Sequence, residues 1–248
     1  MPDMADVLAR GALTQDQLVK GVLDGGYCFD PAQSEADIHL LASGSILQQA
    51  IRAKAELQAL GYEVSLWSMT SYVELQRDAF AVAAANRQNP QAPAQVSKVE
   101  AMFDDASGAI IAVTDYMATL AQGIAAWMPA GYEVLGTDGF GRSDTREKLR
   151  AFFEVDSSFI QYSALSELVA AGHMQLNLGD VQQQLGIRAR CHYAPTSLQS
   201  ANKNSANNIS VPVCSHVSAV RAARFGNLVH EPRNVCRAFG PATKNEPT

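Results

Sequence analysis

The sequence lacks the features of a membrane or exported protein. Although 47% of its 248 residues are hydrophobic, no apolar run approaches the roughly 20 residues that a helix needs to cross a bilayer. The first 25 residues also lack the basic start and apolar core of a signal peptide. We therefore expect a cytoplasmic protein with no membrane partner.

Cysteine is scarce, and its spacing suits neither zinc nor disulfides. Three of the four cysteines and three of the five histidines fall within residues 188–248: Cys191, Cys214 and Cys236 with His192, His216 and His230. Structural zinc sites usually contain compact pairs such as Cys-x2-Cys, whereas Cys214-x-His216 is too tight and the other spacings are irregular. Disulfides are rare in cytosolic proteins, and we interpret Cys28 as a small apolar residue. We predict no metal site.

The balance of charge changes near residue 187. Residues 1–187 hold 11 Lys and Arg against 23 Asp and Glu, a balance of −12, whereas residues 188–248 hold 8 against 2, a balance of +6. One interpretation of the second segment is a basic tail that binds nucleic acid. The other is a flexible extension, or sequence that arises from a shifted reading frame. We favour the second, because the net charge of −6 argues against a nucleic-acid partner, and we expect residues 188–248 to be disordered.

Short apolar segments alternate with helical patterns from residue 38 onward. Buried strands are predicted at 38–42, 63–69, 109–113 and 132–135, and helices at about 47–60, 72–85, 116–127, 145–153 and 158–171. Residues 1–37 form a predicted helical lead-in followed by a linker through Gly25, Gly26 and Pro31. The alternation predicts an α/β domain, a three-layer sandwich whose mostly parallel sheet is covered on both faces.

The stretch from Leu135 to Arg150 is the most distinctive in the chain. Gly136, Gly139 and Gly141 supply a loop after the apolar segment 132–135, since glycine reaches positive φ without steric cost. Asp144 is the predicted N-cap of the next helix, with Glu147 at a capping-box spacing. This arrangement places a polar loop at the carboxyl end of a strand, where open α/β sheets gather functional groups.

Known catalytic and nucleotide-binding patterns are absent from these segments. The three loop glycines match neither a Rossmann fingerprint nor a Walker loop. Ser45 is not in the Gly-x-Ser-x-Gly elbow of hydrolases, and we expect it to cap a helix that Gly61 ends. Asp115 is likewise expected to be a helix cap rather than a base. His39 is expected in the core or at a sheet edge, and His173 on the surface.

The distinctive stretch resembles the C-terminal domain of the homodimeric, thiamine diphosphate-dependent decarboxylating component of bacterial pyruvate dehydrogenase. Four further segments resemble this family in the same order, so that the resemblance covers residues 38–187. They are Leu40–Leu47, Trp67–Tyr72 with Glu74-Leu75 and Arg77-Asp78, Thr114–Met117, and Phe153–Asp156. One segment departs from the pattern, because Ala84–Pro90 lacks the Trp and His that relatives carry there.

The resemblance implies a transketolase C-terminal-like fold for residues 38–187, after a lead-in at 1–37 and before an atypical tail at 188–248. It also implies that the chain is a C-terminal fragment of an enzyme that decarboxylates pyruvate and reductively acetylates the lipoyl group of its partner. In that family, other domains hold thiamine diphosphate, Mg²⁺ and the catalytic glutamate. We therefore expect no catalytic, cofactor-binding or metal residue in this chain. The implied partners are the remainder of the subunit, a homodimer partner and the dihydrolipoyl acetyltransferase.

The loop after residue 135 carries the candidate interface residues. We expect five polar or charged side chains to support contacts with neighbouring domains: Asp138, Arg142, Ser143, Asp144 and Arg146. The alternative for these residues is local pairing that only fixes the loop and the helix start. The alternative for the whole chain is a stand-alone, non-catalytic α/β interaction module.

Overall fold

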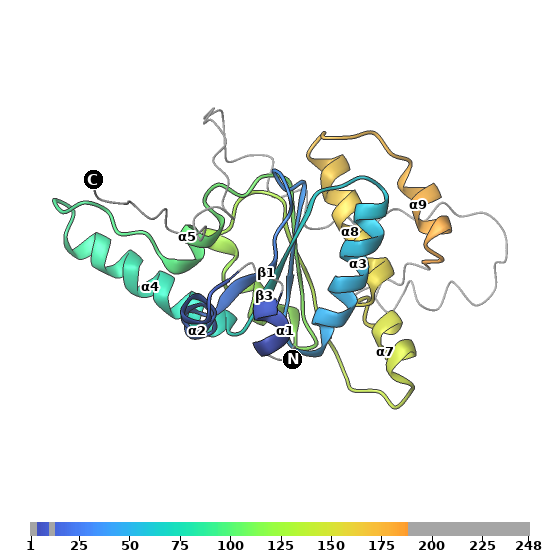
Figure 1. Cartoon of the computed structure of the whole chain (residues 1–248), viewed down its shortest axis with the longest axis horizontal. Helices are drawn as coiled ribbons and strands as arrows, with labels where there is room; N and C mark the ends of the chain where they lie inside the picture. Colours follow the sequence, from blue (N-terminus) through green and yellow to red (C-terminus); the bar gives the residue numbers. More distant parts are fainter. Residues whose placement is uncertain (1–3, 10–12, 188–248) are drawn as a thin grey trace, which may run out of the picture. The chain divides into compact units, whose positions relative to one another are not determined.

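The fold is built on a five-stranded sheet with the strand order β1-β3-β2-β4-β5 (Figure 1). The computed structural model describes residues 4–9 and 13–187, and its helices and strands all lie in one compact unit. Strands β2 to β5 run parallel to one another, and β1 pairs antiparallel with β3. The strands are β1 (Gly26–Asp30), β2 (Ile38–Ala42), β3 (Val64–Met69), β4 (Ala109–Val113) and β5 (Tyr132–Leu135).

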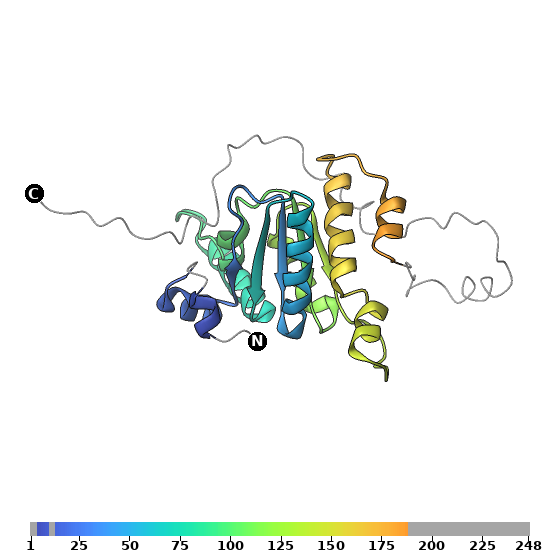
Figure 2. The same cartoon turned by 45° about the vertical axis from the view of Figure 1, so that its right-hand side comes forward.

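Helices cover both faces of this sheet, which confirms the predicted three-layer α/β architecture. Helices α3 and α8 lie side by side on one face, and α4 and α5 lie on the other (Figures 1 and 2). The helices of the described residues are α1 (Met4–Ala9), α2 (Gln15–Asp24), α3 (Leu47–Ala59), α4 (Tyr72–Gln88), α5 (Lys98–Phe103), α6 (Ala118–Gln122), α7 (Arg146–Phe152), α8 (Ser157–Ala170) and α9 (Leu178–Gln184), with 3-10 turns η1 (Gly44–Ile46) and η2 (Ala125–Trp127).

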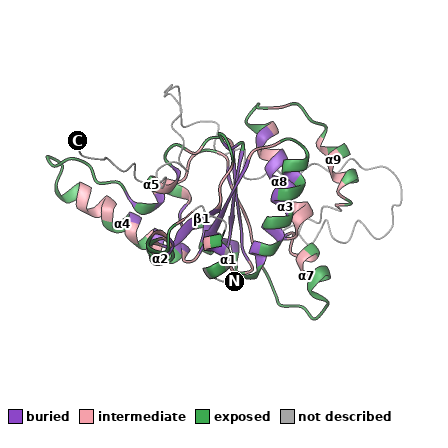
Figure 3. Cartoon of the chain, in the orientation of Figure 1, coloured by how far each residue is buried: buried purple, intermediate pink, exposed green. Residues whose placement is uncertain are grey.

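The core is split by the sheet into two apolar clusters. Every residue of β2, β3 and β4 is buried (Figure 3), as expected for parallel strands covered on both faces. Leu40, Leu66, Ile111 and Val113 pack against α3 and α8. Val134 is only partly buried, because β5 has a neighbouring strand on one side alone.

Strand β1 was missed by the sequence analysis, which placed a linker around Gly25, Gly26 and Pro31. The segment is short, and its pairing partner β3 lies almost forty residues further along the chain, so local patterning cannot reveal it. A buried lysine on α3 helps to hold it. Lys54 Nζ lies 2.9 Å from Asp30 Oδ1 and donates to the Asp30 carbonyl oxygen at 2.9 Å.

Several helix predictions also need correction. The single helix predicted at 116–127 is broken into α6 and η2 around Gly123, and α5 and α9 were not predicted. The helical spacing of the segment 47–60 places Ile51 and Leu60 on the apolar face with Leu57, yet Ile51 is 36% exposed, and Leu60, which follows α3 as its C-cap, is 62% exposed. The helical pattern in residues 3–23 forms two helices, α1 and α2, rather than one.

At the amino end of the parallel strands, the backbone is closely packed. Ala109 N–H donates to the Asp37 carbonyl oxygen at 3.0 Å, and a Cβ on Gly108 would lie 2.0 Å from that oxygen. Gly108 also has φ +81°, a conformation that other residues adopt only with strain. Glycine is therefore required here both for close approach and for backbone conformation.

Candidate functional site

The topology places a switch point at the carboxyl end of the sheet. Strands β2 and β4 are neighbours in the sheet. The connection after β2 leads to β3 on one side, and the connection after β4 leads to β5 on the other side, so the two connections diverge at this point. In open α/β sheets, ligands usually bind in the crevice outside such a switch point. The residues at this position are Ser43–Ser45 after β2 and Thr114–Tyr116 after β4.

In this chain the switch point is bridged by its own side chains. Ser43 Oγ donates to Thr114 Oγ1 at 2.7 Å. The backbone N–H and the hydroxyl of Ser45 both donate to Asp115 Oδ2, at 3.3 and 2.9 Å. The Asp115 carboxylate therefore lies at the start of η1 and α3, where an anion is favoured by the helix dipole. In other α/β proteins a bound anion takes this position at the start of a helix, whereas here the Asp115 carboxylate occupies it.

This geometry corrects the roles expected for Ser45 and Asp115. Ser45 lies inside η1, and it donates to Asp115 instead of capping a helix. Asp115 is not a cap of α6, whose N-cap position is Met117. Within the described residues, Asp115 Oδ1 is buried and accepts no hydrogen bond. A Cβ on Gly44 would lie 2.8 Å from this oxygen, and Gly44 has φ +58°.

The loop between β5 and α7 is fixed against the loop that follows β4. Thr137 N–H donates to the Tyr116 carbonyl oxygen at 2.8 Å, and Thr137 Oγ1 donates to the Asp115 carbonyl oxygen at 2.8 Å. Asp138 Oδ1 accepts from Ala118 N at 3.1 Å, at the start of α6. A Cβ on Gly136 would lie 2.4 Å from Ala118 N. The two loops therefore form one hydrogen-bonded unit.

The five candidate interface residues do not form one ionic cluster. Asp138 is used within the fold, as described above. The Arg142 guanidinium carbon lies 3.9 Å from the centre of the Phe152 ring, a cation–π contact. Arg146 is exposed at the first position of α7, and Ser143 is exposed in the loop.

Asp144 is not the N-cap of α7. The cap is Thr145, whose side chain accepts from Lys148 N at 3.4 Å, so Glu147 is one position short of a capping box. Asp144 Oδ1 instead accepts from Thr145 N at 2.8 Å and lies 3.5 Å from Lys148 Nζ. Asp and Thr are both good caps, and the sequence alone could not distinguish these two neighbours.

Phe140 is the feature of this loop that sequence reasoning missed. Its side chain is 95% exposed between Gly139, which has φ +101°, and Gly141. Three exposed apolar residues lie on the adjoining loop and helix: Tyr116, Met117 and Leu120. The flanking glycines marked a loop, but exposure of the phenylalanine depends on tertiary structure.

The remaining candidate metal-binding residues lie apart from one another. The described residues include no group of three or more His, Cys, Asp or Glu side chains placed to hold a metal ion. Among them, no helix is long and apolar enough to cross a membrane. Cys28 is buried, and His173 is exposed. The tail cysteines and histidines lie outside the described residues, as does the whole segment 188–248.

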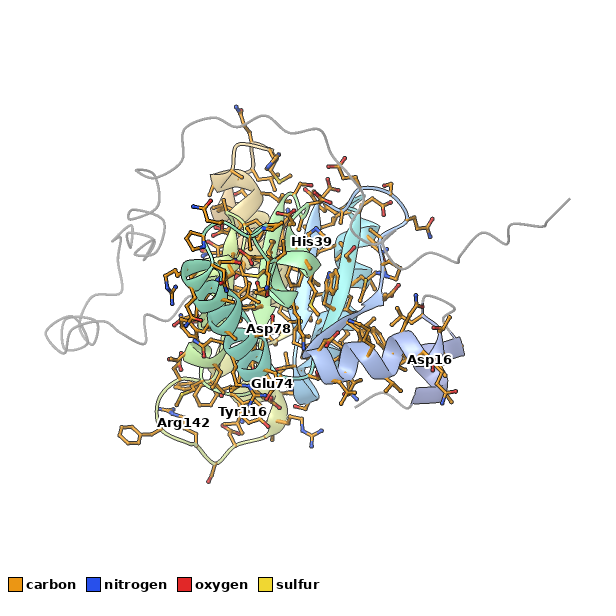
Figure 4. All side chains as sticks on the ribbon, turned by 90° about the vertical axis from the view of Figure 1, so that its left-hand side faces the viewer. Asp16, His39, Glu74, Asp78, Tyr116 and Arg142 are labelled. Atoms are coloured by element: carbon orange, nitrogen blue, oxygen red, sulfur yellow. The ribbon has the colours of Figure 1, made fainter. Side chains whose placement is uncertain are left out.

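His39 is buried at the opposite end of the sheet from Tyr116 and Arg142 (Figure 4). Burial lowers the pKa of His39 to about 4, although a hydrogen bond with the Ser107 backbone partly offsets this effect. Within the described residues its Nδ1 has no hydrogen-bond partner. On β5, burial first and then the nearby Glu167 carboxylate raise the pKa of Glu133 to about 7. These two groups lie away from the switch point, in the body of the fold.

Comparison with known proteins gives consistent matches to the part of the chain that contains the sheet. The family model described as transketolase-like TK C-terminal domain matches residues 25–156. The chain is 41% identical to the pyruvate dehydrogenase E1 component of Pseudomonas aeruginosa over 160 residues, which are 63% of this chain and 18% of that protein. It is 40% identical to the Escherichia coli K12 pyruvate dehydrogenase E1 component over 159 residues, 62% of this chain and 18% of that protein. The chain thus spans under a fifth of the length of these relatives.

Solved structures give a more distant likeness. Transketolase from Pichia stipitis in complex with sedoheptulose 7-phosphate has a TM-score of 0.46 and 18% sequence identity, covering 63% of this chain and 20% of that chain. Transketolase from Campylobacter jejuni has a TM-score of 0.42 and 20% identity, covering 58% of this chain and 19% of that chain.

Proposed function

The chain belongs to the family of transketolase-like C-terminal domains, and from this premise we propose that it serves as the C-terminal domain of a pyruvate dehydrogenase E1 component. The observation that supports this function is the 41% identity to the Pseudomonas aeruginosa enzyme over 160 residues. In the proposed enzyme, pyruvate is decarboxylated and the lipoyl group of the partner subunit is reductively acetylated. The proposed location is the cytoplasm.

The domain contributes architecture rather than catalytic groups in this proposal. Its switch point is bridged by Asp115 and Ser45, an arrangement that supports a structural role. We propose that other domains of the enzyme hold thiamine diphosphate and Mg²⁺. The proposed partners are the remainder of the subunit, a second subunit of a homodimer and the dihydrolipoyl acetyltransferase, and neither nucleic acid nor a membrane.

The loop that contains Asp138, Arg142, Ser143, Asp144 and Arg146 has an interface role in the proposed enzyme. All of these residues except Asp138 are exposed, and Asp138 is partly buried. The base of the loop is anchored, because Thr137 and Asp138 are hydrogen-bonded to the neighbouring loop. Anchoring of the base reduces the conformational entropy that the loop loses on association, which favours binding.

A domain exchange tests the proposal. Residues 25–187 of this chain are placed in the Pseudomonas aeruginosa E1 component in place of the matching region, and pyruvate decarboxylation is measured together with the rate of thermal inactivation. We expect an active chimera, whereas the 248-residue chain alone shows neither turnover nor thiamine diphosphate binding by calorimetry. A chimera that folds without activity, or micromolar cofactor binding by the chain alone, contradicts the proposed function. The first of these results favours the stand-alone interaction module.

A further inference from the structure

Four large apolar side chains are exposed together at the carboxyl end of the sheet. They are Tyr116, Met117 and Leu120 after β4, which are 62%, 55% and 38% exposed, and Phe140 after β5, which is 95% exposed. We call this set the carboxyl-end apolar surface. Single exposed apolar residues are ordinary, but a group on two joined loops is typical of an interaction surface.

The bases of the two loops that carry this surface are held together before any partner binds. The two loops that carry it are joined by the Thr137 N–H bond to the Tyr116 carbonyl oxygen and by the bond from Ala118 N to Asp138 Oδ1. Gly136 lies against Ala118 so closely that no Cβ would fit. A partner therefore meets loops whose bases are already fixed, which reduces the ordering entropy that is lost on docking.

The charged residues around Phe140 have partners within the domain. Asp138 accepts from Ala118 N, Arg142 stacks on Phe152, and Asp144 lies 3.5 Å from Lys148 Nζ. Phe140, in contrast, is almost fully exposed. The group with the most contact area left to bury is therefore the phenyl ring, and buried aromatic side chains are typical anchors of protein interfaces.

We propose that the carboxyl-end apolar surface docks onto the other domains of the same E1 subunit, with Phe140 as the anchor in an apolar recess. This inference rests on the proposed function. Its occupant follows from length: the matched region makes up only 18% of the Pseudomonas aeruginosa relative. More than four fifths of such an enzyme therefore lies in other domains of the same polypeptide, and these are the domains that this one contacts first.

The test compares Phe140→Ser in two settings. In the isolated 248-residue chain, the variant leaves the unfolding midpoint unchanged, because the ring contacts little of the domain. In the chimera with the Pseudomonas aeruginosa enzyme, Phe140→Ser raises the rate of thermal inactivation about tenfold or more, as expected for loss of an interface anchor. Leu60→Ser is the matched control: Leu60 is 62% exposed at the end of α3, remote from the carboxyl-end apolar surface, and its variant inactivates at the wild-type rate.

The outcomes separate this inference from the proposed function. An active chimera in which Phe140→Ser inactivates at the wild-type rate overturns the docking role and leaves the function intact. Equal destabilisation of the isolated chain by Phe140→Ser shows that the ring is structural and also overturns the docking role. An inactive chimera overturns the function and the inference together. If sedimentation shows that the isolated chain forms a dimer that Phe140→Ser dissociates, the occupant is a second copy, and the assignment to the same subunit is wrong.

Discussion

The two ends of the parallel strands are built in different ways. At the amino end, backbone groups pack closely, as where Gly108 meets the Asp37 carbonyl oxygen, and His39 is buried beside them. At the carboxyl end, loops are joined by side-chain hydrogen bonds around Asp115, and Phe140 is exposed beyond them. The amino end is thus closed by its own backbone, whereas the carboxyl end is rigid but leaves apolar surface uncovered.

This difference suits an amino end that determines stability and a carboxyl end with the docking role that we propose. A close backbone approach tolerates no added atom, so substitutions there change the free energy of unfolding directly. A loop fixed by its base but exposed at its tip tolerates substitution at the tip. We therefore expect substitutions at the amino end to lower the free energy of unfolding more than substitutions at the tip of the loop do.

The largest expected effect separates the two ends with one kind of substitution. Gly108→Ala places a Cβ 2.0 Å from the Asp37 carbonyl oxygen at φ +81°, so strain and overlap together should cost about 3 kcal/mol or more of the free energy of unfolding. Gly139→Ala meets no atom within 4 Å at φ +101°, and should cost only about 1–2 kcal/mol. Urea unfolding of both variants measures the two costs.

Equal costs for Gly108→Ala and Gly139→Ala would contradict the comparison between the ends. That result would mean that the strand β4 entry can move away from Asp37, and that the amino end is not closed by its backbone. If the Gly108→Ala chain is unfolded even without urea, the result agrees with the prediction, because the substitution has then removed the whole free energy of unfolding.

The free energy of unfolding should depend on pH through His39, which is buried at the amino end of the strands. The pKa of His39 falls from 6.5 to about 4 on folding because the ring is buried, so between these values the unfolded state binds the extra proton. The contribution of His39 to stability is therefore complete above pH 6.5 and is lost as the pH drops toward 4, by about 3 kcal/mol for the full shift. His39→Gln should flatten this part of the curve, whatever its effect on stability at neutral pH. An unchanged slope in the variant shows that His39 titrates normally.

A smaller pH effect of opposite sign should come from Glu133 on β5. Burial, followed by the Glu167 carboxylate, raises its pKa from 4.5 to about 7 in the folded state. This contribution to stability is therefore complete below pH 4.5 and is lost as the pH rises through 7. Glu133 is only partly buried, so solvent screens part of the effect, and we expect about 1–2 kcal/mol. Glu133→Gln should remove the loss of stability that builds up between pH 4.5 and 7, and urea unfolding at pH 4.5 and 8 checks it.

The sequence predicted the parallel strands of this sheet better than the antiparallel one. The segments 38–42 and 109–113 match β2 and β4, because strands buried between two layers are continuous apolar runs. The segment 132–135 matches β5. Strand β1 was missed, since it forms only through pairing with β3. Local composition indicates which segments are buried, but it does not indicate which distant strand a segment pairs with.

The candidate site shows the same limit. The glycine loop and its position after β5 were visible in the sequence, but the bonds from Ser45 to Asp115 join residues 70 positions apart. Only the strand order brings those residues together. The exposure of Phe140 likewise depends on which surfaces the fold covers, whereas the residue type alone favours burial.

The smallest expected effect concerns the helix start that fixes the far side of the glycine loop. Thr145→Ala removes the oxygen that accepts from Lys148 N at 3.4 Å, and should lower the free energy of unfolding by about 0.5–1 kcal/mol, near the lower limit for N-caps because the bond is long and exposed. Asp144→Ala removes a contact with Lys148 and the hydrogen bond from Thr145 N, both of them exposed and local, and should cost less, about 0.2–0.5 kcal/mol. Urea unfolding of the two variants side by side ranks them. A larger cost for Asp144→Ala would return the cap to the residue that the sequence predicted, and would mean that α7 begins one residue earlier. If Thr145→Ala instead costs more than Asp144→Ala, the Asp144 carboxylate lies outside the helix. It then belongs to the exposed loop that carries Phe140, where a docking partner can reach it.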